Sequence, residues 1–164
     1  MRGAKRRQQA QLAWATACND ARHLAVELAA RRPAQPIDVM NLGLVIHPDE
    51  TAYRYVNATI SQYDTSVGLW PIPTPVAILI TDRRLMARLP HGAAISYWWN
   101  SVVALDVNLE AGQVVLDYGD NEPRAFGGPA VPDIAVAAVA AAYGVTGMLR
   151  HPGLNYLRSA RQAI

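Results

Sequence analysis

The sequence predicts a mainly β domain with added helices: a small, strongly curved antiparallel sheet of about seven strands, capped by a C-terminal helix and preceded by an N-terminal helix. Three observations lead to this class. Residues 75–110 hold four short strand-like segments separated by turns, residues 134–149 carry no charge, and residues 4–31 show helical apolar spacing. Hairpins followed by one helix favour an antiparallel sheet closed by that helix.

Four strands are predicted within residues 75–110. Residues 76–81 are apolar on both alternating faces, as in a central strand that is covered on two sides. A polar turn then leads into an alternating strand over residues 85–89, and residues 94–99 form the third strand. Residues 103–110 alternate apolar and polar side chains most regularly, so we expect one dry and one wet face there.

Three further strands flank this stretch. Residues 52–63 form a long first strand, with Tyr53 on its wetter face. Residues 114–118 make a hairpin with the preceding strand, and residues 124–126 form a short last strand that ends at two glycines. The predicted sheet therefore has about seven strands.

A helix is predicted over residues 132–143. Pro132 suits the first helical position, Asp133 suits the positive end of the helix, and Gly144 ends it. The uncharged stretch from 134 to 149 is shorter than a typical membrane span and contains glycines. A helix that plugs the open end of the sheet explains the same apolarity.

Residues 4–31 predict an amphipathic helix that Pro33 ends. Its apolar stripe needs a partner, since an isolated helix rich in alanine is only marginally stable. We expect it to pack on its own domain or on a second copy. The alternative is an anionic membrane surface, bound by four N-terminal cations: Arg2, Lys5, Arg6 and Arg7. Nucleic acid is not the expected partner, because a short basic run near a single tryptophan is a weak footprint.

The chain divides into three parts. Residues 1–36 hold the basic helix and a proline linker, residues 37–149 form the domain, and residues 150–164 form a basic tail. The net charge is +5 over residues 1–32, −6 over 33–149 and +3 over 150–164. An acidic body with basic ends favours contacts with other copies of itself, and basic ends attract anionic surfaces.

No group of residues has the spacing of a catalytic triad, a metal site or a phosphate loop. The four histidines are never closer than 24 positions, and Cys18 on the N-terminal helix is interpreted as a small buried residue. Residues 47–50, His-Pro-Asp-Glu, are interpreted as a turn before a strand and not as acid-base machinery. We therefore expect no enzyme activity, no cofactor, no metal and no small-molecule substrate.

Several of these segments resemble the GRAM-like and bacterial pleckstrin-homology-like families. They are an apolar run into residues 81–85 (Thr-Asp-Arg-Arg-Leu), a strand that ends near Trp98 and Trp99, a Val-rich strand, the phrase at residues 46–50 and a closing helix. The resemblance covers roughly residues 42–144. It implies a curved sheet capped by a C-terminal helix and a role in binding.

The loop over residues 64–74 departs from the pattern of the lipid-binding members. In those families the first hairpin loop often carries the ligand contacts, with several basic side chains. This loop holds Asp64 and no cation, and only Arg54 lies nearby. Phosphoinositide binding by the usual route is therefore not expected.

The expected function is a non-catalytic binding or scaffolding module that acts through protein contacts and forms a homo-oligomer. The candidate anchors are three tryptophans: Trp70 on a proline-stiffened loop, and Trp98 and Trp99, whose side chains must point to opposite faces of one strand. The alternatives are a peripheral lipid-binding domain and an enzyme with a dispersed site. A single cysteine and no visible signal peptide predict a cytoplasmic, possibly membrane-peripheral, protein.

Overall fold

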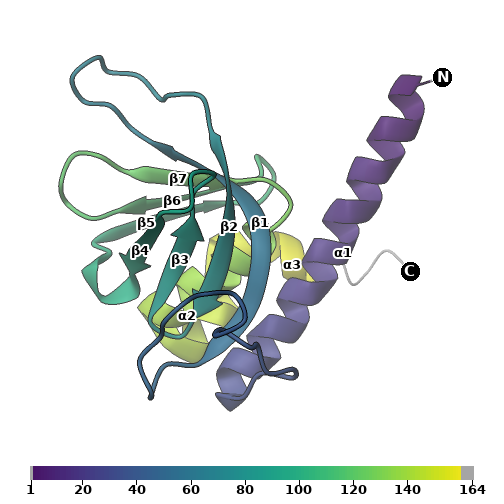
Figure 1. Ribbon diagram of the computed structural model, residues 1–164. Coiled ribbons are helices and arrows are strands. Elements are labelled where there is room, and N and C mark those ends of the chain that lie inside the picture. Colours follow the sequence, from purple (N-terminus) through teal and green to yellow (C-terminus); the bar gives the residue numbers. More distant parts are fainter. Residues whose placement is uncertain (1, 160–164) are drawn as a thin grey trace.

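The computed structural model describes residues 2–159 and contains one seven-stranded sheet with helices before and after it (Figure 1). The strands are β1 (Ala52–Gln62), β2 (Thr74–Thr81), β3 (Arg84–Arg88), β4 (Ala94–Trp98), β5 (Ala104–Asn108), β6 (Gln113–Asp117) and β7 (Arg124–Gly127). The helices are α1 (Arg2–Ala30), α2 (Val131–Arg150) and α3 (Asn155–Ser159), with short 3-10 turns η1 (Trp99–Ser101) and η2 (Pro152–Leu154).

The sheet is antiparallel throughout, in the order β4-β3-β2-β1-β7-β6-β5. Strand β1 joins the two halves, because it pairs with β2 over most of its length and with β7 over its last four residues. The two edge strands, β4 and β5, are consecutive in the chain and are connected only by residues 99–103. Such a short connection between opposite edges forces the sheet to curl. The predicted antiparallel sheet of about seven strands is confirmed.

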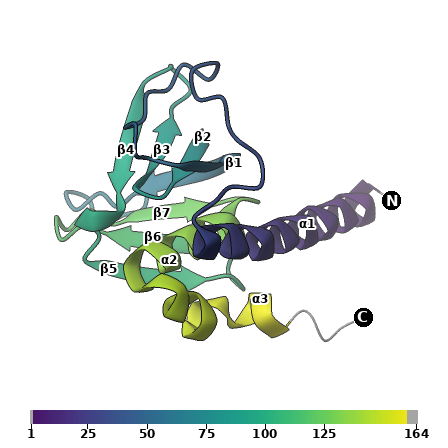
Figure 2. The same ribbon diagram turned by 90° about the horizontal axis from the view of Figure 1, so that it is seen from below.

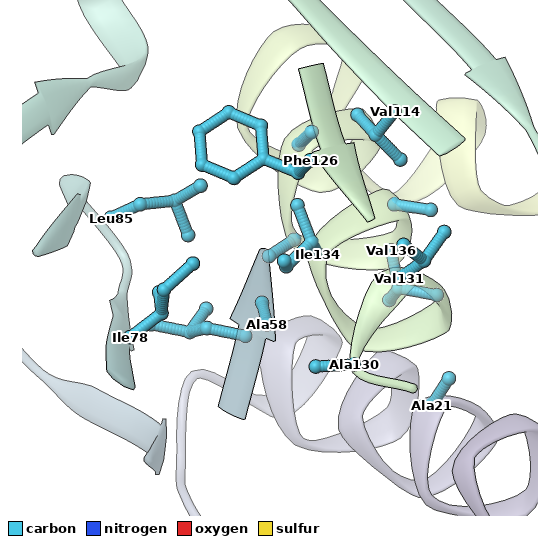
Figure 3. Packing of buried hydrophobic residues seen from close by; sticks show 14 of the residues in the cluster. Ala21, Ala58, Ile78, Leu85, Val114, Phe126, Ala130, Val131, Ile134 and Val136 are labelled. Atoms are coloured by element: carbon cyan, nitrogen blue, oxygen red, sulfur yellow. The ribbon is translucent and has the colours of Figure 1, made fainter. Parts of the chain in front are cut away.

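The concave face of the sheet packs on the first half of α2 (Figure 2). Residues 131–139 of this helix are all buried. Figure 3 shows Ile134 of α2 pointing at Phe126, with Leu85 and Ile78 on the facing strands. Complete burial of each such side chain stabilises the fold by roughly 1.5–3 kcal/mol. The uncharged stretch thus forms the centre of the core.

Helix α2 differs from the prediction beyond residue 143. Gly144 has φ 69° and breaks the helix, but a second helical piece continues to Arg150. Glycine takes this left-handed conformation without the steric cost that a Cβ imposes. By length and composition α2 is the one described helix that is apolar enough to cross a membrane. The first half of α2 is buried and Gly144 breaks the helix, so its apolar composition is that of a core helix.

Helix α1 packs on the rest of the chain from Trp14 onward, since Trp14 contacts Tyr156 and packs against the core. Ala21 and Leu24 are fully buried, and the Nε of Arg22 donates to the carbonyl of Leu157 at 2.8 Å. Arg31 then takes φ 54° and ends the helix before the linker. The side chains of residues 3–13, by contrast, are all exposed. In both views this end of α1 extends beyond the body of the protein (Figures 1 and 2).

Residues 37–50 form a strap across the outer face of β2 and β3. Leu44 is buried against Leu79 and Met86, in a small apolar cluster outside the main core. The strap consists of turns and irregular chain. Side chains of the sheet hold it in place. One such side chain is Arg88, whose Nη2 donates to the carbonyls of Leu42 and Gly43, both at 3.1 Å.

One expectation about β1 is wrong. The alternation of β1 predicts Tyr53 on the wetter face, yet only 3% of it is exposed. The register of β1 against β2 shifts between Ala52 and Arg54, and this irregularity breaks the alternation of faces at the start of the strand.

Candidate binding site

The connection between β1 and β2 is a structured arm, residues 63–73, that projects from the sheet (Figure 1). Asp64 and Leu69 form an isolated β-bridge, and Gly68 turns the chain between them with φ 64°. The carboxylate of Asp64 accepts hydrogen bonds from the N–H and the hydroxyl of Ser66. These bonds hold the pKa of Asp64 below its ordinary value.

The second half of the arm folds back over the sheet. The Ser61 hydroxyl on β1 donates to the carbonyl of Pro71 at 2.8 Å. The Trp70 ring packs edge to face against Tyr63, with ring centroids 5.3 Å apart. Prolines on either side of Ile72 restrict the backbone further. The arm is therefore ordered before any partner arrives.

A groove of about 510 Å³ lies between this arm and the β5–β6 turn, on the outer face of the sheet. Its lining comes from three places: the strands β1 and β7 with the start of β6, the arm, and the β5–β6 turn. The residues are Thr59, Ser61, Trp70, Pro71, Ile72, Pro73, Ala111, Gly112, Gln113, Ala125, Phe126 and Gly127. None of these side chains is charged, so the groove itself offers mainly apolar contacts.

The floor of the groove is shallow because short side chains face it. Ala125 of β7 pairs with Ser61 of β1, and Gly127 pairs with Thr59. A Cβ on Gly127 would lie 2.8 Å from the Thr59 Oγ1, so the floor has room only for glycine at this position. The short side chains on the paired strands β1 and β7 thus leave a depression, and the arm forms one side of it.

The arm presents an unusual number of exposed apolar side chains. Ile72 is 91% exposed, Leu69 64%, Val67 62% and Trp70 44%. Scattered exposed apolar residues are normal on proteins, whereas a contiguous group beside a groove marks an interaction site. Water is displaced from this group when a partner covers it.

Acidic side chains lie near the groove, on β5 and in the turns on either side of β6. Asp106, Val115, Ala125 and Ser61 are successive cross-strand partners from β5 to β1, so Asp106 lies on the same outer face as the floor. Residues 104–127 contain five acids and one arginine. The acids are Asp106, Glu110, Asp117, Asp120 and Glu122. The arginine, Arg124, donates to Asp120 at 2.6 Å and stacks over Tyr118.

The chemistry of the groove lining is mainly apolar. The groove lining contains no titratable side chain. Within residues 2–159, no three His, Cys, Asp or Glu side chains lie close enough together to hold a metal ion. An apolar groove with acidic side chains nearby favours a ligand that combines apolar and basic groups.

The three candidate tryptophans lie at three different places. Trp70 is part of the arm and lines the groove. Trp98 is 40% exposed on the outer face of β4, where the Arg84 guanidinium lies 4.3 Å from its ring centroid. Trp99 begins η1 instead of ending a strand, packs on the core, and its indole N–H donates to the carbonyl of Thr81 at 3.0 Å. Trp98 and Trp99 do point to opposite sides, but only Trp70 lines a groove on the outer face.

The candidate cationic residues lie together at the free end of α1. Lys5, Arg6 and Arg7 are exposed, and Arg2 is the first residue of the helix. Among the described residues, none of α1 is part of the groove lining.

Sequence reasoning missed the β7 and β5–β6 contributions to the groove. Ala125 and Gly127 alternate as small residues on one face of a short strand, and this was the available signal. It carries meaning only once the pairing of β7 with β1 is known.

Comparison with known proteins adds little to this description. No family model matches the chain, and no curated protein matches it. Among solved structures, the C-terminal domain of an unknown protein from Leishmania infantum is similar, with 13% sequence identity and a TM-score of 0.37. The alignment covers 62% of this chain and 86% of that one. At this TM-score the likeness supports no inference about fold or function.

Proposed function

We propose that this protein is a non-catalytic, cytoplasmic binding module that takes a segment of a protein partner in the groove beside the arm. The observation that carries the proposal is the exposed wall of Trp70 and Ile72 above a floor of small side chains. A partner that covers this wall gains about 25 cal/mol for each Å² of apolar surface buried. Because the arm is already ordered, little conformational entropy is lost on binding.

The proposal includes a pleckstrin-homology-like fold. In support, β1 is shared between two halves of a curled antiparallel sheet, and a helix follows the last strand and fills the concave face. The arm is also the first hairpin loop of the domain, which is where the ligand contacts of those families often lie. It lacks the basic side chains of the lipid-binding members, and this absence favours a protein ligand over a phosphoinositide headgroup.

The test is selection of binding peptides from a random displayed library on the full chain. Fluorescence polarisation then compares the selected peptides on the wild type and on the Trp70→Ala and Ile72→Ser variants. We expect each arm variant to weaken binding by about tenfold or more, as for other interface anchors. Val45→Ser is the matched control, because Val45 is 82% exposed on the strap and away from the groove. Peptides that bind Trp70→Ala and the wild type equally well would exclude the groove as the site.

A peripheral membrane role is the second candidate. Lys5, Arg6 and Arg7 are exposed on α1, and residues 2–18 contain no acid. Such a segment is attracted to an anionic leaflet by about 1 kcal/mol for each cation near the surface. Pelleting with vesicles of phosphatidylcholine, with and without phosphatidylglycerol, measures this directly. Salt-sensitive pelleting that is lost when Arg2, Lys5, Arg6 and Arg7 are changed to Ala would favour the membrane role.

A further inference from the structure

We propose that the segment bound in the groove is the exposed N-terminal end of α1 from a second copy of this chain, residues 2–13. This inference rests on the proposed function of the groove and names its partner. The chain would then carry both the ligand and the binding site, on different parts of its surface.

The segment combines the basic and apolar side chains that the groove favours. It carries four cations, Arg2, Lys5, Arg6 and Arg7, and no acid. Leu12 is 62% exposed in the same segment and supplies an apolar side chain. Lys5, Arg6, Arg7 and Leu12 are exposed, as are all residues from 3 to 13.

The strand β5 and the turns near the groove carry the opposite charge. Asp106 and Glu110 are exposed on β5 and at the β5–β6 turn, and Asp120 and Glu122 lie in the β6–β7 turn. Gln62, at the end of β1 next to the arm, donates to Glu122 at 2.7 Å, which places that acid near the base of the arm. Opposite charges across a contact steer association and fix its orientation.

The segment cannot reach the groove of its own chain. Helix α1 is continuous over 29 residues, roughly 43 Å at 1.5 Å per residue. Its C-terminal half is fixed by the Asp20 contact with Arg54 and by the buried Leu24. In both views the free end of α1 points away from the sheet (Figures 1 and 2). Only another molecule can bring this segment to the groove.

The contact joins two different surfaces, so it has a definite consequence for assembly. Each copy that donates its helix still has an empty groove, and each copy that accepts one still has a free helix. A head-to-tail contact of this kind either closes into a ring or continues as an open chain. The assembly grows with protein concentration and shrinks with salt, because screening weakens exposed charge pairs.

Sedimentation velocity of the full chain tests the inference. The helix variant combines Lys5→Glu, Arg6→Glu and Arg7→Glu. The groove variant combines Asp106→Lys and Glu110→Lys. We expect the wild type to associate at tens of micromolar in low salt and to dissociate in high salt, and each variant alone to associate at least about tenfold more weakly. Mixing the two variants restores association, because the reversed charges again attract.

The matched control reverses three exposed cations elsewhere: Arg32→Glu, Arg83→Glu and Arg150→Glu. It changes the net charge as much as the helix variant, yet it leaves the proposed contact intact, so its association should equal that of the wild type.

Three results would overturn the inference. They are a wild type that is monomeric in low salt, a helix variant that associates like the wild type, and a control that loses association as the helix variant does. If the wild type is monomeric but selected peptides still bind in a Trp70-dependent manner, the groove remains a protein-binding site and only its assigned partner is wrong. Binding of a monomeric wild type to anionic vesicles through Lys5, Arg6 and Arg7 would assign the helix to a membrane instead.

Discussion

Arg84 on β3 donates to both carboxylate oxygens of Glu50, with Nε to Oε1 and Nη2 to Oε2 distances of 2.9 Å and 3.0 Å. The Thr81 hydroxyl donates to the same carboxylate at 2.7 Å, and the Glu50 side chain has no exposed surface. Burial alone would raise the pKa of Glu50, but the hydrogen bonds from Arg84 and Thr81 outweigh it and hold the pKa below its ordinary value. The pair therefore ties the strap to the sheet.

The first prediction concerns this pair. Glu50→Gln removes the charge that neutralises Arg84 in a site where only 12% of the Arg84 side chain is exposed. We expect the free energy of unfolding to fall by about 3 kcal/mol, as when one partner of a buried ion pair is lost. Urea denaturation measures the change. Asp49→Asn, at an exposed position one residue earlier, serves as the control and should stay within about 0.5 kcal/mol of the wild type. An equal effect of both substitutions would contradict the role of the pair.

A second polar group joins α1 to the domain. Arg54 on β1 donates to Asp20 at 2.8 Å and to Glu27 at 2.5 Å, both on α1. Asp133, at the start of α2, is only 3% exposed, and its Oδ1 has no hydrogen-bond partner. Burial, reinforced by the negative charge of Asp20, raises the pKa of Asp133 to about 8. The Arg54 charge opposes this rise without cancelling it.

The second prediction is a pH dependence set by Asp133. In the folded state this carboxyl keeps its proton up to about pH 8, whereas in the unfolded chain it loses the proton near its ordinary pKa of 3.8. Between these values the folded state binds more protons, so stability falls as the pH rises, by at most about 1.4 kcal/mol per pH unit. We expect urea midpoints of the wild type to decrease from pH 5 to pH 8. The Asp133→Asn variant cannot ionise, so its midpoints should change less, and parallel curves for the two proteins would refute the assignment.

The positions of the strands could be predicted because alternation of apolar and polar side chains is a local property. All seven segments that alternate or stay apolar form strands within two residues of the expected limits. The burial of Tyr53 could not be predicted in this way, since it depends on an irregular pairing of β1 with β2 that the first strand alone does not encode.

The candidate site needed information from distant parts of the chain. Trp70 could be named as a candidate anchor from its place between turn residues. The floor of the groove comes from the pairing of Thr59 with Gly127 and of Ser61 with Ala125, more than sixty positions apart. The contact of Glu50 is also non-local. The turn at residues 47–50 could be predicted, but the arginine partner of Glu50, 34 positions away, could not.

The third prediction separates the two adjacent tryptophans. Trp99→Phe removes the hydrogen bond to the Thr81 carbonyl and leaves that acceptor unpaired in a partly buried place. We expect a loss of about 1–3 kcal/mol in the free energy of unfolding. Trp98→Phe keeps an aromatic face under Arg84 at a site that is 40% exposed, so its loss should stay below about 1 kcal/mol. Thermal denaturation of the two variants gives the comparison. A larger loss for Trp98→Phe would reverse the assigned roles.

The last prediction tests the floor of the groove by a double substitution. A Cβ on Gly127 would lie 2.8 Å from the Oγ1 of Thr59, its partner across β1 and β7. The Thr59 side chain is β-branched and leaves few alternative rotamers, so it cannot move aside freely. We expect Gly127→Ala alone to lower the free energy of unfolding by about 1–2 kcal/mol, in the range that overpacking costs. Thr59→Ala removes the conflicting oxygen, so in the double variant the cost of Gly127→Ala should largely disappear. Urea denaturation of the wild type, the two single variants and the double variant yields the interaction energy between the positions. Strictly additive effects would mean that Gly127 is not held to glycine by Thr59, and that the depth of the groove has another origin.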